Sequence, residues 1–323
     1  MWGIYIYKTI CKMNRVFRKY LFILSGLVSS SLYGQQESQF TQYMHVPQFF
    51  NPAYAGNRGI MSLRTITRSQ WVDLEGAPKT SLISFDTPVG ADNKVGLGGT
   101  IFYEQIGPLT ETNFSFDYSY SINFMFSKLS FGLKAGLNSY DIDFNKLNIY
   151  DRTDPYIGFS VDNKFQPQIG VGIFYNTQSY YMGISAPNLL ERKYFDLVDT
   201  ESSFFSTFSK KIHLYFIGGY VFDLNPSLKF KPATLVKVVK GSPIQWDLSL
   251  NFILNNNFTF GFANRIDSAI TTMAGIQLSD SMMIGFSYDF TSTEIRNSTS
   301  GSFEVLFRFD FGTNRKILTP RFF

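Results

Sequence analysis

Alternation of apolar and polar residues, unbroken over Phe114–Phe124 at the centre of Asn113–Phe126, is the feature that most constrains the fold of this chain. Phe, Tyr or Ile occupies positions 114, 116, 118, 120, 122 and 124, and Ser, Asp or Asn occupies the positions between them. Side chains on a β-strand point to opposite faces with a period of two. One face is therefore aromatic and apolar, and the other is small and polar. A tilted strand needs about 9–11 residues to cross a bilayer, and this segment is long enough.

The same alternation returns along the chain, while no apolar run reaches 18 residues, so the sequence does not predict transmembrane helices. Aromatic residues make up 18% of the chain, yet the mean hydropathy is only −0.04. Apolar content spread at period two is typical of outer-membrane strands. We predict an all-β fold, a transmembrane antiparallel β-barrel of about 14 strands over residues 60–312. The strands are expected at about 60–72, 79–88, 94–104, 112–125, 128–140, 166–176, 179–186, 210–223, 227–239, 243–254, 257–265, 269–278, 281–291 and 302–312.

The connections between these strands provide an independent test. With both termini taken as periplasmic, every second connection of a barrel should be a tight turn. Those connections are short and built from turn residues, at 90–93, 126–128, 176–178, 223–226, 255–257 and 279–281. The long connections, 141–165, 187–209 and 292–301, all have the other parity. The sequence thus predicts short periplasmic turns and long extracellular loops.

The N-terminal residues 1–34 resemble a secretory signal peptide. Arg15, Arg18 and Lys19 precede the apolar run Leu21–Val28, and small residues lead to a cleavage site expected after Gly34, with Met13 as an alternative start. Residues 1–34 hold five of the 29 Lys and Arg residues and no Asp or Glu, so their removal leaves 24 basic and 25 acidic residues. This balance does not suggest nucleic-acid binding. The single cysteine, Cys11, is removed as well.

Residues 35–59 form an irregular lead-in because prolines and glycines interrupt any regular pattern there, and residues 313–323 are expected to form a periplasmic tail. In the last strand, aromatic and apolar residues at positions 303–311 alternate with Glu304, Arg308 and Asp310. Closure of a barrel places its first strand beside its last. We therefore expect Arg64 and Arg68 of the first strand to face the lumen and to form ion pairs with Glu304 and Asp310 across this seam.

Glycines recur on the lumen-facing parity of the predicted strands, and they allow two interpretations. Glycine in a strand marks either a bend of the sheet or the close approach of another backbone. The first interpretation is curvature of a mid-sized barrel, and the second is a lumen filled by a plug or by an inserted segment of a partner. The glycines concerned are Gly96, Gly98, Gly132, Gly136, Gly170, Gly172, Gly183, Gly219, Gly261, Gly275 and Gly285.

Residues with catalytic or metal-binding potential are few. The chain has two histidines, His45 in the lead-in and His213 on a predicted strand, and no Cys/His cluster with metal-ligand spacing. Neither a phosphate-binding glycine loop nor a dinucleotide-binding motif is present. Lys229, Lys231 and Lys237 share one face of a strand and are expected to line the lumen. We predict a protein that is not an enzyme and needs no cofactor or metal.

Residues 39–80 carry a set of four short motifs: Gln39–Met44 (QFTQYM), Asn51–Gly56 (NPAYAG), Arg68–Trp71 (RSQW) and Glu75–Thr80 (EGAPKT). In this order and spacing they resemble the PorP/SprF family of Bacteroidetes outer-membrane proteins, and the resemblance extends to the strand layout of the mature chain. Asn51-Pro52 and Gly56 can fix a tight turn that returns the lead-in to the barrel wall. Trp71 suits an interfacial aromatic belt. The candidate motif or partner-binding residues are Asn51, Pro52, Ala53, Tyr54, Gly56, Arg68, Gln70, Trp71, Gly76, Pro78 and Thr80.

The resemblance implies a role in type IX secretion at the cell outer membrane. Some members of this family are needed to secrete or anchor large cell-surface adhesins used in gliding motility, and their cargo carries a C-terminal secretion domain. Expected partners are such a secreted protein, other type IX secretion components and outer-membrane lipid. Alternatives from the barrel alone are a passive pore or small-molecule transporter, or a hydrolase that uses His213. The motif residues themselves either start and close the barrel or contact the partner.

Overall fold

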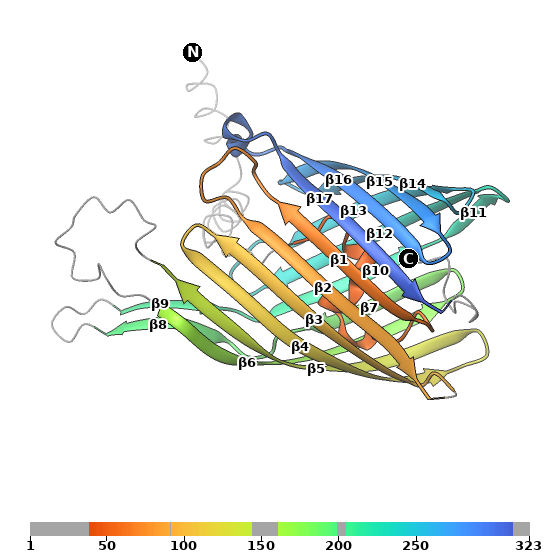
Figure 1. Cartoon of the computed structure of the whole chain (residues 1–323), viewed down its shortest axis with the longest axis horizontal. Helices are drawn as coiled ribbons and strands as arrows, with labels where there is room; N and C mark the ends of the chain where they lie inside the picture. The colour runs from red at the N-terminus through yellow and green to blue at the C-terminus, as the bar shows by residue number, and fades with distance from the viewer. Residues whose placement is uncertain (1–38, 91, 144–160, 199–204, 313–323) are drawn as a thin grey trace, which may run out of the picture. The chain divides into compact units, whose positions relative to one another are not determined.

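Fourteen antiparallel strands of the described chain close into a barrel, as the sequence predicted (Figure 1). This computed structural model describes residues 39–90, 92–143, 161–198 and 205–312. The predicted signal peptide, residues 1–34, and the predicted tail, residues 313–323, lie outside that range. All the elements discussed below belong to one compact unit, Glu37–Lys240 with Ile244–Phe323.

The strands lie within a few residues of their predicted positions, except that β6 begins earlier than expected. The first half of the wall consists of β1 (Met61–Ser69), β2 (Lys79–Val89), β3 (Val95–Ile106), β4 (Leu109–Asn123), β5 (Ser127–Ile142), β6 (Val161–Thr177) and β7 (Tyr180–Ala186). The eighth strand of the wall is formed by β10 (His213–Tyr220), which β11 (Phe222–Asn225) continues. The remainder is β12 (Leu228–Val239), β13 (Gln245–Leu254), β14 (Phe258–Arg265), β15 (Ala269–Ser279), β16 (Met282–Thr291) and β17 (Ser302–Phe311).

Consecutive strands pair with one another around the whole barrel. The seam is an antiparallel pairing of β1 with β17, in which Arg68 lies opposite Glu304 and Arg64 opposite Arg308. β10 pairs with both β7 and β12, which completes the circle. Closure satisfies the hydrogen-bonding groups that an open sheet would expose at its edges. The connection after β7 holds a feature that the sequence did not predict, a separate hairpin of β8 (Arg192–Val198) and β9 (Phe205–Lys210).

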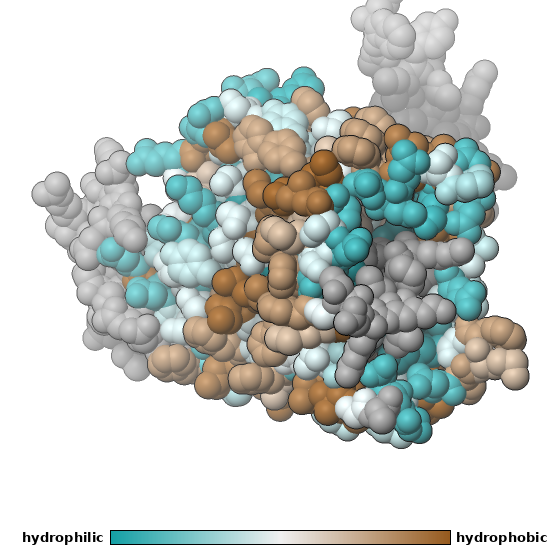
Figure 2. All heavy atoms as spheres, turned by 45° about the vertical axis from the view of Figure 1, so that its right-hand side comes forward, coloured by the Kyte–Doolittle hydropathy of each residue, from teal (hydrophilic) through white to brown (hydrophobic). Residues whose placement is uncertain are grey.

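The two faces of the wall differ as the alternation in β4 predicted. Phe116 points outward with 71% of its surface exposed, whereas its neighbour Asp117 points inward and is 2% exposed. In Figure 2, hydrophobic residues run down the middle of the visible face, and hydrophilic residues lie at its top and along its sides. An apolar exterior of this kind suits a surface in contact with lipid. No helix among residues 39–312, as far as they are described, is long and apolar enough to cross a membrane.

All the long connections lie at one end of the barrel, which also has the short connections 107–108, 240–244 and 266–268, whereas the other end has short turns alone among the connections of its strands. Turns of a few residues join β2 to β3, β4 to β5, β6 to β7, β11 to β12, β13 to β14 and β15 to β16. The opposite end carries the long connections 70–78, 143–160, 187–212 and 292–301, the last of which contains the short helix η4 (Glu294–Ser298). Short turns are periplasmic and long loops extracellular in outer-membrane barrels. We call the end with the long loops the outer mouth and the other end the inner mouth.

Candidate functional site

Residues Gln39–Ile60, which we call the plug, lie inside the barrel. The plug contains three short helices, η1 (Tyr43–His45), α3 (Pro47–Phe50) and η2 (Pro52–Tyr54), and it appears in Figure 1 as the red-orange segment enclosed by the strands. The sequence predicted an irregular lead-in that returns to the barrel wall. The structure differs, because this segment fills the lumen. Of the two interpretations of the inward-facing glycines, the structure therefore favours the one with a filled lumen.

The plug and the wall share one apolar core. The buried plug residues Phe40, Tyr43, Met44, Val46, Phe50 and Tyr54 belong to the same cluster as inward-facing Ile66, Leu82, Leu235 and Leu306 of the wall. Phe49 stacks on Phe102 of β3, with ring centroids 5.3 Å apart. Inward apolar residues are unexpected in a water-filled channel, which has a polar interior. Apolar residues at the inward, otherwise polar positions of the strands were the signal in the sequence that could have revealed a packed lumen.

Glycines of the wall let the plug backbone and side chains approach the strands closely. A Cβ atom on Gly132 would collide with the backbone of Pro52 and Ala53, and one on Gly172 would collide with the side chain of Asn51. A Cβ on Gly183 would lie 2.7 Å from Nδ2 of Asn51, which no real contact allows. The plug also approaches Gly96, Gly98 and Gly285, whereas added Cβ atoms at Gly136, Gly170, Gly219 and Gly261 would meet other parts of the chain.

The Asn51–Gly56 motif is the part of the plug that fits these glycines. Asn51 caps η2 by accepting a hydrogen bond from Ala53 N (3.0 Å), and its Nδ2 donates to the backbone oxygen of Ile173 in β6 (3.0 Å). Ala55 O accepts from the hydroxyl of Ser119 (2.7 Å). Gly56 has φ +68°, and a Cβ there would lie 2.7 Å from Cα of Gly96. Both the backbone conformation and the close approach therefore require glycine at position 56.

Aromatic and cationic contacts hold Tyr54 of the same motif. Its ring packs edge-on against Phe174, with centroids 5.4 Å apart. The guanidinium carbon of Arg64 lies 5.7 Å from the centre of the Tyr54 ring, within the range of a cation–π interaction. Arg64 also forms a buried ion pair with Asp86 of β2. Tyr54 thus links the plug to β6 through Phe174 and to β1 through Arg64.

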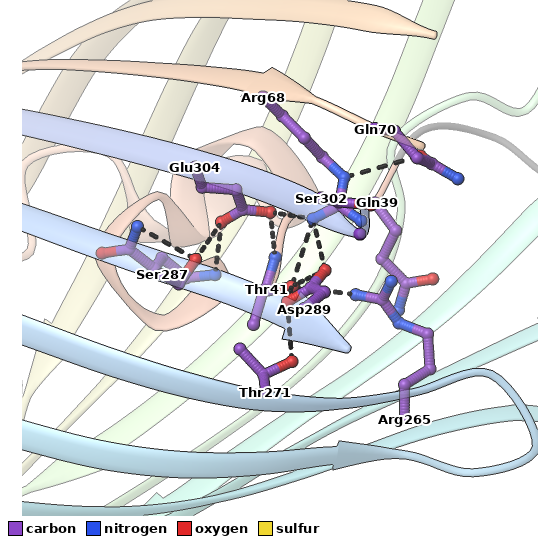
Figure 3. A network of polar contacts seen from close by, with 12 residues as sticks. Gln39, Thr41, Arg68, Gln70, Arg265, Thr271, Ser287, Asp289, Ser302 and Glu304 are labelled. Carbon is purple, nitrogen blue, oxygen red and sulfur yellow. Dashed lines mark hydrogen bonds and ion pairs between the residues drawn. The ribbon is translucent and has the colours of Figure 1, made fainter. Parts of the chain in front are cut away.

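A polar network holds the plug near the outer mouth (Figure 3). Glu304 accepts two consecutive backbone N–H groups of the plug, Thr41 N at 2.6 Å and Gln42 N at 3.0 Å. The Thr41 hydroxyl lies 3.0 Å from both carboxylate oxygens of Asp289. Arg68 bridges the two acids, at 2.6 Å from Glu304 and 2.7 Å from Asp289. Side chains from β1, β16 and β17 therefore converge on Thr41.

The network continues to β13 and β14. Gln39 Nε2 donates to Asp247 Oδ2 at 2.6 Å, and Arg265 Nε pairs with Asp247 Oδ1 at 3.0 Å. Three buried carboxylates thus face two arginines. The remaining donors are Gln39, Thr41 and Gln42 of the plug and the hydroxyls of Thr271 and Ser287 in the wall. Buried charges are stable only when they are paired and hydrogen-bonded. The plug consequently supplies part of the hydrogen bonding that these buried charges need.

A second polar group holds the plug near the inner mouth. Arg58 Nη2 pairs with Asp310 Oδ2 at 2.7 Å, and Gly56 N donates to Asp86 Oδ2 at 2.8 Å. Asn57 Nδ2 donates to the Ser130 hydroxyl at 3.0 Å. Between the two polar ends, Gln48 donates to Asp117 at 2.8 Å. The plug therefore contacts the wall along its whole described length.

The seam residues face the lumen, but their pairing differs from the expected one. Arg68 pairs with Glu304 across the seam. Arg64 pairs with Asp86 rather than with Glu304 or Asp310, because the register sets Arg64 opposite Arg308 in β17. Asp310 pairs instead with Arg58 of the plug and, at 3.3 Å, with Arg308. The expectation for Arg64 was wrong because it considered only the two seam strands and omitted β2 and the plug.

The second pair of motifs, Arg68–Trp71 and Glu75–Thr80, lies at the outer mouth. Trp71 and Asp73 both have positive φ, 49° and 75°, in the 70–78 loop. Hydrogen bonds fix this loop on several sides: Gln70 N donates to Pro78 O (3.0 Å), Val72 N to Gly301 O (2.9 Å) and Gly107 N to Gly76 O (2.9 Å). The loop borders a cavity of about 460 Å³ whose lining includes Gln70, Trp71, Glu75, Gly76 and Lys79. Thr80 is buried in β2 and donates to Glu104 (3.2 Å).

The histidine and lysine side chains of the wall that could have had a chemical role lie in surroundings that give them a structural one. His213 is buried in the wall, and its ring stacks on Tyr215 with centroids 6.3 Å apart. Lys231 and Lys237 are buried on the inner face, whereas Lys229 bonds to Asn256 of a periplasmic turn. The described residues contain no group of three or more His, Cys, Asp or Glu side chains placed to hold a metal ion.

Comparison with known proteins adds a family. Residues 32–309 match the family described as type IX secretion system membrane protein PorP/SprF. No curated protein sequence matches the chain. Among solved structures, it is similar to the outer membrane protein Omp33 of Acinetobacter baumannii (6% identity, TM-score 0.46, covering 78% of this chain and 98% of that one). It is also similar to a FadL homologue of Pseudomonas aeruginosa, with 12% identity and a TM-score of 0.46, covering 82% of this chain and 94% of that one. A third similar structure is the CymD monoaromatic hydrocarbon channel, with 13% identity and a TM-score of 0.48, covering 86% of this chain and 95% of that one.

Proposed function

Because the chain belongs to the PorP/SprF family of type IX secretion system membrane proteins, we propose that it helps to secrete and anchor a large cell-surface adhesin. The protein resides in the outer membrane, as its family and its closed barrel with an apolar exterior require. In this proposal it acts without enzymatic chemistry and engages the C-terminal secretion domain of its partner. A role in gliding motility in a member of the Bacteroidetes is part of the same proposal.

The filled lumen is the observation that carries the proposal. A secreted chain needs an open path to pass through a barrel, and here that space is occupied by the plug and by the side chains packed on it. The plug is held by buried ion pairs and hydrogen bonds at both of its ends. The barrel is therefore better suited to serve as a closed platform for the partner than as its conduit.

The outer mouth offers the surface on which we propose that the partner rests. The Asn51–Gly56 motif is enclosed by the barrel, so a structural role in holding the plug is better supported for it than partner contact. The 70–78 loop is different, because its motif residues Gln70, Trp71 and Gly76 border an external cavity. Hydrogen bonds to 300–301 and 107 hold the loop in one conformation, which lowers the entropic cost of binding. We assign partner contact to this loop.

Deletion of the gene tests the proposal. Surface display of one large adhesin should be lost in the deletion strain, as detected by antibody labelling of intact cells, while uptake of small antibiotics stays unchanged. Co-purification from the native membrane should recover the same adhesin with the wild-type barrel. Normal display of every large surface protein in the deletion strain would contradict the proposal.

A passive pore or small-molecule transporter is the alternative function. It predicts steady conductance of the purified protein in planar bilayers, whereas a barrel closed by its plug should be electrically silent. Steady open-channel currents from the wild-type protein would favour the alternative.

A further inference from the structure

The direction in which the plug runs through the barrel has a consequence for the N-terminal end of the protein. Arg58 pairs with Asp310, the second-to-last residue of β17, close to the inner mouth. Gln39 bonds instead to Asp247, the third residue of β13, whose start lies at the outer mouth. The plug therefore enters β1 at the inner mouth and has its N-terminal end near the outer one.

Several independent contacts fix this direction. Thr41 and Gln42 bond to Glu304, the third residue of β17, and Arg68, the penultimate residue of β1, reaches Thr41 at 3.3 Å. All these positions lie at the ends of their strands that join the 70–78 and 292–301 loops. At the opposite end, Gly56 and Asn57 bond to Asp86 and Ser130, which are close to periplasmic turns.

The packing of the lumen also decides which way the preceding chain can leave. A return to the inner mouth would need a second segment beside residues 43–56. Plug residues there, including Tyr43, Val46, Phe50 and Ala53, have at most 1% of their surface exposed. The wall approaches the plug so closely that it requires glycine at positions 132, 172 and 183. A second segment has no room beside the plug.

We propose that the chain preceding Gln39 leaves the barrel through the outer mouth, so that the N-terminal end of the mature protein lies at the cell surface. This differs from the periplasmic N-terminus that was the premise for the parity of the connections. The barrel strands keep that parity, because β1 still begins at the inner mouth. The N-terminal end then lies on the same side of the membrane as the 70–78 loop, where a partner at the outer mouth can reach it.

Single-cysteine labelling tests this topology. The only cysteine of the sequence is Cys11, so a Cys11→Ser background gives a barrel without thiols. Glu37→Cys is introduced two residues before the plug, and intact cells are treated with a maleimide of polyethylene glycol too large to cross the membrane. We expect Glu37→Cys to shift in mass in intact cells.

Two control positions calibrate the experiment. Glu294→Cys lies in η4 at the outer mouth and should be labelled in intact cells, whereas Asp280→Cys lies in the exposed turn after β15 and should be labelled only after permeabilisation. Heat-modifiable migration on gels confirms that each variant is folded. Labelling of Glu37→Cys only after permeabilisation, or only after unfolding, would overturn the proposal, as would a reversal of the two controls. The result does not depend on adhesin display, so it can fail while the proposed function stands.

Discussion

Gly183 of β7 makes room for the side chain of Asn51 in the plug. A Cβ atom at position 183 would lie 2.7 Å from Asn51 Nδ2 and 2.8 Å from Cδ2 of Phe174. The Asn51 carboxamide meanwhile bonds both to its own helix and to β6. A residue of the wall and a residue of the plug thus share a space that admits only one side chain.

Gly183→Ala should destabilise the folded barrel by about 1–3 kcal/mol, the usual cost of overpacking a well-filled core. Gly275→Ala is the matched control on the inner face of β15. The nearest neighbour of its added Cβ would be the flexible end of Met283, at 3.0 Å, and the next atoms lie at 3.6 Å, an ordinary contact distance. The measurement is the urea midpoint of unfolding in lipid vesicles. Equal midpoints for the two variants would contradict the assigned plug contact.

Gly56→Ala should lower the free energy of unfolding more than Gly90→Ala does, although both glycines have positive φ, +68° and +85°. A left-handed conformation costs an alanine roughly 1–2 kcal/mol at either position. At position 56 the added Cβ also meets Cα of Gly96 at 2.7 Å, whereas at position 90 it meets nothing within 4 Å. The difference between the unfolding free energies of the two variants isolates the close approach. A difference near zero would show that the plug can shift to accept a side chain.

Glu304→Gln should destabilise the barrel by about 3–5 kcal/mol, the cost of breaking a buried ion pair by removing one partner. The amide cannot serve Thr41 N, Gln42 N and Arg68 together, because one of its two terminal atoms is a donor. Lys94→Ala removes the exposed ion pair with Asp92 and should cost about 0–1 kcal/mol. The measurement for both variants is the temperature at which the band of the folded barrel disappears from a gel. A Glu304→Gln barrel as stable as the Lys94→Ala barrel would exclude a role of Glu304 in holding the plug.

Loosening the plug should convert a silent barrel into a leaky one. The double variant Gly132→Ala/Gly172→Ala adds a side chain at two points where the wall touches the Asn51–Ala53 backbone and side chains. In planar bilayers we expect no steady conductance from the wild type and intermittent channel openings from the double variant. Silence of a correctly folded double variant would mean that the lumen stays sealed without these contacts.

Trp71→Ala should reduce display of the secreted partner without loss of the barrel, because Trp71 borders the cavity at the outer mouth. Ile244→Ala, an exposed apolar side chain in the connection between β12 and β13, is the control. Display is measured by antibody labelling of intact cells at equal barrel abundance. Full display in the Trp71→Ala strain would remove the 70–78 loop from the proposed contact surface.

The strands could be predicted closely because their signals are local. The period of two in β4, the turn residues between strands and the aromatic residues of β17 are all contained in short windows of sequence. The pairing of Arg64 with Asp86 is different, because it depends on which neighbouring strand brings a carboxylate within reach, and Asp86 lies diagonally opposite Arg64 in the register of β1 and β2. The hairpin β8–β9 was also missed, since it lies within a connection whose length alone had been considered.

By itself, the sequence determined that this chain forms a barrel of about fourteen strands, which of its faces meets lipid, and which connections are short. Alternation and turn chemistry decide these properties segment by segment. Only the tertiary structure decided that the lumen is closed and that the plug runs with its N-terminal end outward. A glycine on the inner face indicates that something comes close, but not what comes close. Gly183 and Asn51 are more than 100 residues apart along the chain, and only closure of the barrel around the plug brings them into contact.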